Sequence, residues 1–257
     1  LFLSDSTGST RKGFSMSEKN VWEELEKIVS NHHRGRLIIA TFSSWISRVQ
    51  QLVNICEKYD KTIFLSGRSM VENINIAKEL WYLNIKDGIM KKMTPKNTEG
   101  ILPHKQVVIT TGSQWEEFSA LSRMADWRHN SVEIVRWDTI IFSSSIVPGN
   151  EKSVISIINR LIKLWANVIT KDDGEVHTWG HAFQEEQKIF LDLIKPKYFM
   201  PIFWDLYFRT VHKNTAVDTG FREDNVLMLD NGNMVDFAPK NGRVFKSRIK
   251  APIQELV

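Results

Sequence analysis

The sequence predicts an α/β fold in which a parallel β-sheet is covered by helices on both faces. Short runs of β-branched residues recur along the first 175 residues, and helical patterns of apolar residues alternate with them. The strand-like runs are almost continuously apolar, which is typical of parallel strands buried on both faces. The composition fits a folded globular chain, because 42% of its 257 residues are hydrophobic and 25% are charged.

The strand and helix candidates alternate along this part of the chain. The strand candidates are residues 36–42, 62–67, 106–111, 138–144 and 167–170. The helix candidates are residues 45–58, 70–81, 116–125 and 152–165. In the first of these helices Ile46, Val49 and Leu52 fall on one face, which favours packing against a sheet.

The pattern changes near residue 175, so we expect one domain over 1–175 and a second segment over 176–257. The turn sequence Asp230-Asn231-Gly232-Asn233 predicts a β-hairpin. The stretch 203–220 shows no regular pattern. The elements expected in the second segment are a helix over 184–194, a strand over 198–202 and hairpin strands over 226–229 and 234–237.

Small hydroxyl and glycine residues follow four of the predicted strands, where the carboxyl ends of parallel strands meet at one edge of the sheet. Hydroxyl groups, glycine backbone and helix N-termini can hold phosphate oxygens, and ligands of such sheets bind at this edge. The alternative is that these residues only cap helices and form turns. The candidate phosphate-binding residues here are Ser43, Ser44, Arg48, Arg68, Gly112, Ser113, Ser144 and Ser145.

Two histidines, His177 and His181, stand four residues apart near the predicted domain boundary. Trp179-Gly180 between them is poor helix material, so we expect a turn from strand to helix, where ring and backbone nitrogens can face one ligand. A neutral histidine beside the positive end of a helix suits a phosphate group. The alternative is that both are ordinary surface residues.

Several motifs resemble those of bacterial ribonuclease J, in the same order and over nearly the whole chain. They are Leu3-Ser4-Asp5-Ser6-Thr7, Gly13-Phe14-Ser15-Met16-Ser17-Glu18, Ser66-Gly67-Arg68-Ser69-Met70, Thr111-Gly112-Ser113-Gln114, Ala120-Leu121-Ser122-Arg123, Phe142-Ser143-Ser144-Ser145, Pro148-Gly149-Asn150-Glu151 and Leu193-Ile194-Lys195-Pro196-Lys197. The ribonuclease J family belongs to the β-CASP branch of the metallo-β-lactamase superfamily. The resemblance therefore implies a β-CASP domain followed by a segment of a metallo-β-lactamase αββα fold.

The resemblance also implies a function in RNA processing and decay. It implies a metal-dependent ribonuclease, acting as a 5′-to-3′ exonuclease and as an endonuclease, in which this region clamps RNA over a two-zinc site. Asp5 and His181 match catalytic residues of the family, and His181 is expected to reach the scissile phosphate. His177 and Gly180 match its phosphate pocket. The expected partners are RNA and a second copy of the chain or a related ribonuclease subunit.

The chain departs from the family in its metal ligands. The family's His-x-His-x-Asp-His motif is absent, and Phe203 stands where the family has a ligand histidine in Pro-x-His-Gly-Glu. A phenyl ring cannot coordinate zinc. We therefore expect zinc in a longer parent protein, with those ligands before Leu1, and neither bound metal nor activity in this chain alone. Two alternatives are a non-catalytic RNA-binding module of the same fold and an unrelated nucleotide-binding α/β domain.

Tryptophan occupies seven positions where the family pattern has glycine, and Trp179 stands where the pattern has serine. An indole is a poor replacement for glycine wherever positive φ or close backbone approach is needed. Either the chain is an inactive relative that stacks RNA bases on exposed indoles, or the residue assignment at these positions does not reflect the gene. The seven positions are Trp22, Trp81, Trp115, Trp127, Trp137, Trp165 and Trp204.

The bulk properties of the chain are compatible with this function. The 34 Lys and Arg against 30 Asp and Glu give a net charge of +4, which tolerates a polyanionic partner without requiring one. No apolar run reaches the length of a membrane span and no secretory signal is visible, so we expect a cytoplasmic protein without membrane contact. The single cysteine, Cys56, is expected to be inert packing in a reducing compartment. Both ends look cut, so we expect a piece of a longer protein.

Overall fold

The computed structural model describes residues 1–111, 119–144, 146, 149–237 and 244–246. The chain divides into two compact units: Met16–Thr178, called here the sheet unit, and Leu1–Ser15 with Trp179–Val257, called here the terminal unit. The division expected near residue 175 differs from this one, because residues 1–15 join the terminal unit. They do so through strand pairing between β1 (Phe2–Asp5) and β8 (Phe199–Ile202), which are far apart in the sequence.

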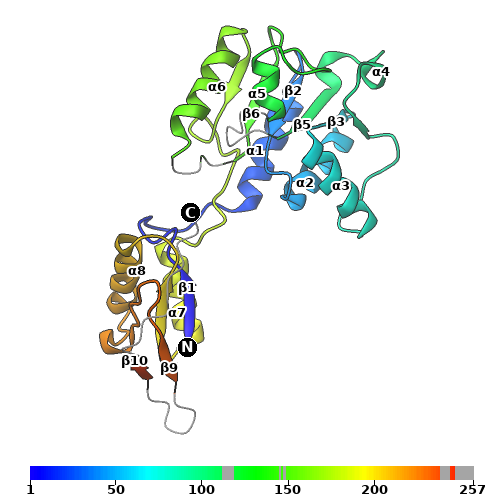
Figure 1. Ribbon diagram of the computed structural model, residues 1–257. Helices are drawn as coiled ribbons and strands as arrows, with labels where there is room; N and C mark the ends of the chain where they lie inside the picture. Colours follow the sequence, from blue (N-terminus) through cyan, green and yellow to red (C-terminus); the bar gives the residue numbers. More distant parts are fainter. Residues whose placement is uncertain (112–118, 145, 147–148, 238–243, 247–257) are drawn as a thin grey trace. The chain divides into compact units, whose positions relative to one another are not determined.

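The sheet unit contains a six-stranded sheet whose neighbours all pair in parallel, in the order β4-β3-β5-β2-β6-β7 (Figure 1). The strands are β2 (Leu37–Ala40), β3 (Thr62–Ser66), β4 (Met90–Lys92), β5 (Gln106–Thr110), β6 (Thr139–Phe142) and β7 (Asn167–Ile169). The five predicted strands are all present, and the four in the middle of the sheet are adjacent. The predicted parallel α/β fold is therefore confirmed.

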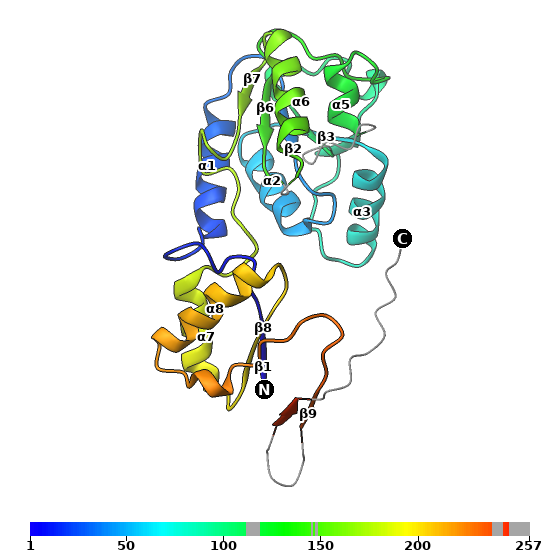
Figure 2. The same ribbon diagram turned by 60° about the vertical axis from the view of Figure 1, so that its left-hand side comes forward.

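Helices cover both faces of this sheet (Figures 1 and 2). Alternate residues of a strand point to opposite faces, so Leu37 and Ile39 of β2 pack in one core and Ile38 and Ala40 in the other. The first core is closed by α1 (Glu18–Ser30), α2 (Ile46–Lys58) and α3 (Arg68–Glu79), and the second by α5 (Ala120–Ala125) and α6 (Glu151–Lys163). The short helices α4 (Pro95–Thr98) and η1 (Pro103–Lys105) precede β5.

Cys56 of α2 is fully buried in the first core. Burial raises the pKa of the Cys56 thiol to about 12, so the group stays protonated at neutral pH and acts as apolar packing, as its position in the sequence predicts.

Helix α1 was not among the predicted helices, although its sequence carries the usual signals. Ser17 caps the helix by accepting a hydrogen bond from the Lys19 N–H at 3.0 Å. Val21, Leu25 and Val29 follow at a spacing of four residues and are fully buried. These three side chains fix α1 on the sheet through tertiary packing.

The terminal unit is built on the parallel pair β1 and β8, with α7 (Gln184–Ile194) and α8 (Leu206–Asp218) in contact with each other. Its small core contains Leu191, Phe199, Ala216 and Val226. The predicted helix over 184–194 and the strand over 198–202 are present, whereas α8 lies in the stretch for which no pattern was found. The helix η2 (Glu223–Asn225) follows α8.

The predicted hairpin over 226–237 is wrong. Val226 forms an isolated parallel bridge with Phe199, and the Leu227 N–H donates to the Phe199 carbonyl, so this segment pairs toward β8. The strand β9 (Val235–Phe237) pairs antiparallel with β10 (Val244–Lys246) instead. Tertiary pairing overrides the local turn signal here. In the part of the chain that the structure describes, no helix has the length and apolar character of a membrane span.

Candidate active site

The carboxyl ends of four parallel strands form one edge of the sheet in the sheet unit. Ser66 of β3 is in register with Thr110 of β5, Thr110 with Ala40 of β2, and Ala40 with Phe142 of β6. The residues that follow these four strands therefore share one edge, as the sequence predicts. We call this edge the strand-end rim.

The candidate phosphate-binding residues on the strand-end rim differ in accessibility. Ser44 and Arg68 are exposed, and Ser43 is half-buried with its Oγ accepting a hydrogen bond from Asn73 Nδ2 at 3.0 Å. Ser144 is only 4% exposed, and among the described residues its Oγ finds no hydrogen-bond partner. The remaining candidates, Gly112, Ser113 and Ser145, lie outside the described residues.

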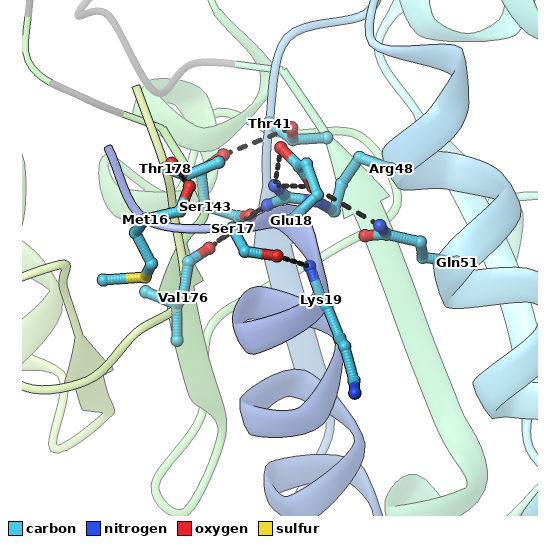
Figure 3. Close-up of polar contacts among 10 residues, drawn as sticks. All are labelled: Met16, Ser17, Glu18, Lys19, Thr41, Arg48, Gln51, Ser143, Val176 and Thr178. Atoms are coloured by element: carbon cyan, nitrogen blue, oxygen red, sulfur yellow. Dashed lines mark hydrogen bonds and ion pairs between the residues drawn. The ribbon is translucent and has the colours of Figure 1, made fainter. Parts of the chain in front are cut away.

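Arg48, a candidate phosphate-binding residue in the sequence, lies fully buried on α2 (Figure 3). Its Nη2 donates to the two carboxylate oxygens of Glu18, at 3.0 and 2.8 Å. Its Nη1 donates to Ser143 Oγ and, at 3.2 Å, to the Val176 carbonyl oxygen. A buried guanidinium needs such partners because its desolvation is costly, and these contacts leave Arg48 no exposed edge for a phosphate.

The contacts of Arg48 hold two distant chain segments together within the sheet unit (Figure 3). Ser143 Oγ donates to the Val176 carbonyl at 2.8 Å, and Thr178 Oγ1 donates to the Met16 carbonyl at 2.5 Å. Gln51 Nε2 adds a contact to Glu18 at 3.3 Å. The start of α1 is thereby joined to residues 176–178. Glu18 was not singled out from the sequence, because its pairing with Arg48 depends on the fold.

His177 is 6% exposed, and its ring packs edge-on against Trp45 with 5.1 Å between ring centroids. Burial, with a smaller effect from the charge of Arg48, lowers the pKa of His177 to about 4, so the ring is neutral at pH 7. Its Nδ1 is buried without a hydrogen-bond partner. A neutral ring can exchange a hydrogen bond with a phosphate but cannot form an ion pair with it.

Asp5 and His181 form a close pair in the terminal unit. His181 Nδ1 lies 2.6 Å from Asp5 Oδ2, while Asp5 Oδ1 accepts hydrogen bonds from the Thr7 N–H at 3.1 Å and from Thr7 Oγ1 at 2.6 Å. Burial acts to raise the pKa of Asp5, but the hydrogen bonds from Thr7 and His181 outweigh it and hold that pKa below its ordinary value. An ionised carboxylate can only accept hydrogen bonds, so His181 Nδ1 carries the proton and Nε2 is left for other contacts.

Gly8 allows the segment of Asp5 to approach the segment of His181. A Cβ at Gly8 would lie 2.2 Å from the Ala182 carbonyl oxygen, which is far inside van der Waals contact. Gln187 Nε2 bridges the same segments by donating to the Ala182 carbonyl at 3.2 Å and to the Asp5 carbonyl at 3.5 Å. His181 and His177 fall in different units, and Gly180 between them is exposed.

A second histidine, His212, contacts Ser6, the residue that follows Asp5 in the sequence. Ser6 Oγ and His212 Nδ1 are 3.1 Å apart, and the His212 ring packs edge-on against Phe199 with 4.9 Å between centroids. Burial lowers the pKa of His212 to about 4, although the charge of Asp5 acts in the opposite direction. His212 is therefore neutral at pH 7. It was missed in the sequence because α8 shows no regular pattern.

The side chains of this site do not fit a metal centre. Among the residues that the structure describes, no three His, Cys, Asp or Glu lie close enough together to hold a metal ion. Asp5 is in register with Ile202, so Phe203 follows at the same end of the strand pair, and its phenyl ring is 66% exposed. Asp5 and His181 bind each other. A two-zinc centre would need donor atoms beyond these.

Trp179 lies beside His181, with 6.3 Å between their ring centroids. The guanidinium of Arg11 stacks over the Trp179 ring at 3.7 Å, so this face of the indole is already covered. Trp115, which follows the predicted strand over 106–111, lies outside the described residues.

The parallel, helix-covered sheet unit is consistent with a β-CASP domain. Residues 34–161 match the family described as "Ribonuclease J, beta-CASP domain". The chain belongs to the ribonuclease J family.

Relatives that carry the name Ribonuclease J match almost the whole chain. The protein of Helicobacter pylori (strain B128) is 39% identical over 240 residues, which are 93% of this chain and 34% of that protein. Ribonuclease J of Corynebacterium glutamicum is 38% identical over 95% of this chain and 33% of that protein. Ribonuclease J 1 of Streptococcus pyogenes is 36% identical over 94% of this chain and 43% of that protein. The chain thus spans about a third to two fifths of the length of these relatives.

Proposed function

We propose that this chain is the RNA-clamping region of a metal-dependent ribonuclease and that Asp5 and His181 act at the scissile phosphate. The observation that carries the proposal is the 2.6 Å contact between His181 Nδ1 and Asp5 Oδ2, which joins residues 176 positions apart. Both side chains are about two-fifths exposed, so the pair is open to a ligand. In this proposal the sheet unit corresponds to a β-CASP domain and the terminal unit to part of a metallo-β-lactamase domain.

The geometry supports a proton-transfer role for His181. Asp5 holds the Nδ1 proton and therefore fixes the ring orientation and the tautomer. When protonated, His181 donates from Nε2 to a phosphate oxygen and can pass that proton to the leaving oxygen, while Asp5 stabilises the imidazolium. Asp5 acts through His181 and orients it.

Residues of the strand-end rim supply the RNA clamp in this proposal. Exposed Ser44 and Arg68, half-buried Ser43, and the unpartnered polar atoms of Ser144 and His177 can hydrogen-bond phosphate oxygens. Arg48 acts indirectly, because its buried contacts hold the backbone just before His177 in place. Phosphate contacts of this kind predict binding that weakens with salt and depends little on RNA sequence.

In this proposal the whole protein binds zinc, through residues other than those described here. The whole protein would act from the 5′ end of RNA and also internally, and it would assemble with itself or with a related ribonuclease subunit. The RNA-binding module without catalysis remains the second candidate, favoured by Phe203 at the end of β8. A His-x-His-x-Asp-His motif elsewhere in the parent protein would exclude that candidate.

The test compares His181→Ala with His33→Ala, an exposed histidine of the sheet unit, in the full-length protein. We expect His181→Ala to lower the cleavage rate of 5′-monophosphorylated RNA by about 10²–10⁴-fold, because a positioned acid–base group contributes on that scale. RNA affinity should stay within a few-fold, and His33→Ala should change neither quantity. Unchanged cleavage in His181→Ala, or a fall matched by an equal loss of affinity, would refute the catalytic role.

A further inference from the structure

An open pocket of about 510 Å³ lies at the carboxyl ends of β3 and β4 in the sheet unit, a size that suits a mononucleotide. The two strands are parallel and adjacent, so Ser66 and Lys92 end at the same edge of the sheet. Gly67 and Arg68 then begin α3, whose first turn carries no acidic residue and whose N-cap makes no side-chain hydrogen bond. The amino end of α3 therefore offers free N–H groups to the pocket.

The pocket contains a buried donor without an acceptor. His129 Nδ1 accepts hydrogen bonds from the Ser131 and Val132 N–H groups, at 3.2 and 3.1 Å, so the ring proton of the neutral form sits on Nε2. That Nε2 lies 3.0 Å from Ser66 Oγ and donates to it. Ser66 is 3% exposed, and within the described chain no acceptor takes its own hydroxyl proton. This proton can point to a ligand in the pocket.

Three cationic side chains line the same pocket: Arg68, Lys92 and Arg123. All three are exposed, and none pairs with a carboxylate of the described residues. Among the described residues of the lining, Glu72 is the one carboxylate against three cations, so positive charge prevails there. Arg36, Arg48 and Arg160, in contrast, all have carboxylate partners.

We propose that this pocket binds the phosphate of a nucleotide unit, through Arg68, Arg123, Lys92 and the Ser66 hydroxyl. Part of the proposal rests on the proposed function, since an RNA chain on the strand-end rim is one source of such a unit. A free mononucleotide is the other source. The shared chemistry is a phosphate ester held by cations and by the amino end of α3.

The experiment measures binding of uridine monophosphate and of a decauridylate RNA to the full chain and to Arg68→Ala and Arg123→Ala. Lys163→Ala, at the far end of α6, is the matched control. At low salt we expect Arg68→Ala and Arg123→Ala each to bind the ligand of the pocket about tenfold or more weakly than the parent chain, which corresponds to about 1.4 kcal/mol. Lys163→Ala should bind it as the parent chain does.

Comparing the two ligands distinguishes the two sources of the phosphate, a free mononucleotide and an RNA chain. Weaker binding of both ligands assigns the pocket to a mononucleotide, and weaker binding of RNA alone assigns it to a unit of an RNA chain. Unchanged affinity of the arginine variants for both ligands overturns the pocket. If the parent chain binds no RNA, the proposed function fails, while uridine monophosphate still tests the pocket.

The backbone at several tryptophans has an unusual conformation. Five of the eight tryptophans that the structure describes adopt the left-handed conformation, which a bulky residue rarely does and glycine adopts freely. They are Trp81 (φ 62°), Trp127 (φ 60°), Trp137 (φ 80°), Trp165 (φ 60°) and Trp204 (φ 61°). Of the other positions where the family pattern has glycine, Trp22 lies inside α1 and Trp115 outside the described residues.

Three of these tryptophans end helices in the same way as a glycine does elsewhere in the chain. After α3, the Trp81 N–H donates to the Lys78 carbonyl at 3.1 Å and the Tyr82 N–H to the Ala77 carbonyl at 2.8 Å. The same pair of hydrogen bonds surrounds Trp127 after α5, Trp165 after α6 and Gly220 after α8. This Schellman motif places a left-handed residue just after the helix, and glycine is its usual occupant.

The indole side chains at these three positions make few packing contacts that could offset the cost of the left-handed backbone conformation. Trp81 is 92% exposed, Trp165 is 74% and Trp127 is 60%. Side chains retained for their contacts would be buried, so the backbone requirement is the dominant signal at these positions.

We infer that these five positions are glycine in the protein made by its own cell, and that a single codon explains all of them. UGA differs from the glycine codon GGA by one base and from the tryptophan codon UGG by one base. Some genetic codes read UGA as tryptophan and others read it as glycine. A gene with UGA at these positions, decoded as glycine, yields the backbone observed here.

Two measurements test this inference. The codons should be UGA at all five positions, and peptide masses of the protein from its native cells should show glycine there; UGG codons, or tryptophan in those peptides, would overturn it. In the recombinant chain, Trp81→Gly, Trp127→Gly and Trp165→Gly should each raise the Tm. Trp45→Gly is the control and should lower it, because that indole packs against Phe42 and His177. A lower Tm in all four variants would also count against glycine at these positions.

Discussion

Each unit of the molecule contains a carboxylate paired with a basic partner, and the two pairs differ in the burial of that partner. In the sheet unit Arg48 is fully buried, while the side chain of Glu18 is 41% exposed, and Arg48 Nη1 donates to Ser143 and Val176. In the terminal unit Asp5 and His181 are each about two-fifths exposed, and within the described part of the chain no residue hydrogen-bonds to His181 Nε2. The pair with the buried arginine supports the fold, and the pair with the exposed histidine is available for chemistry.

The largest expected effect tests the pair of Arg48 and Glu18. Arg48→Ala removes a guanidinium with no exposure and deprives Ser143 Oγ and the Val176 carbonyl of their hydrogen bonds from Arg48, whereas the Glu18 side chain is 41% exposed and its carboxylate stays hydrated. We therefore expect the free energy of unfolding to fall by about 2–4 kcal/mol, measured by urea denaturation. Arg68→Ala, an exposed arginine, is the control and should change it by less than about 0.5 kcal/mol. If Arg48→Ala instead keeps its stability and loses RNA affinity, Arg48 is a direct phosphate ligand and the contrast between the two pairs fails.

The next effect tests what holds the exposed pair together. Gly8→Ala places a methyl group 2.2 Å from the Ala182 carbonyl oxygen, so the backbone must shift. We expect a loss of about 1–3 kcal/mol in unfolding free energy, as for overpacking in general. Gly180→Ala is the matched control, because nothing lies within 4 Å of its added Cβ, and it should be nearly neutral. Equal effects of the two variants would show that close approach at Gly8 is unimportant.

Each unit also holds one buried neutral histidine, which predicts a pH dependence. The pKa of His177 and that of His212 are about 4 in the folded chain, against 6.5 for a free histidine. Between these values the unfolded chain binds more protons, so the stability present above pH 6.5 is lost as the pH falls toward 4. Each histidine contributes up to about 1.4 kcal/mol per pH unit.

The pH prediction is checked by urea denaturation at several pH values between 4 and 7. His177→Gln and His212→Gln should each flatten the slope, whereas His33→Gln, at an exposed position, should leave it unchanged. A slope that survives in both buried-site variants would mean that other groups cause the acid sensitivity.

The smallest expected effect is at an ion pair whose lysine is exposed on the surface. Lys58 Nζ lies 2.5 Å from Glu26 Oε1 on the surface of the sheet unit, and the carboxylate raises the pKa of Lys58. Solvent screens such a pair, so Lys58→Ala should leave the unfolding free energy almost unchanged. A loss of unfolding free energy as large as that of Arg48→Ala would show that burial does not explain how much an ion pair contributes to stability.

The sequence determined the sheet unit well because its signals are local. Strands β2, β3, β5 and β6 are apolar runs that need cover on both faces, and α2 and α6 show one apolar face each. Parallel strands share one edge at their carboxyl ends, so the strand-end rim also followed from the sequence. The terminal unit was harder, because α8 has no clear apolar stripe and β9 pairs with β10 rather than with the segment at 226–229.

Tertiary packing, and not the local sequence, selects which of the candidate side chains stay accessible. The sequence gives Arg48 and Arg68 the same side chain next to the same rim, but burial of Arg48 against Glu18 occupies its guanidinium, while Arg68 remains exposed. Asp5 meets His181 only because β1 pairs with β8 and Gly8 admits the close approach. A local sequence pattern indicates which side of a strand or helix must be buried. The partners of a charged group depend instead on packing between residues that are far apart in the sequence.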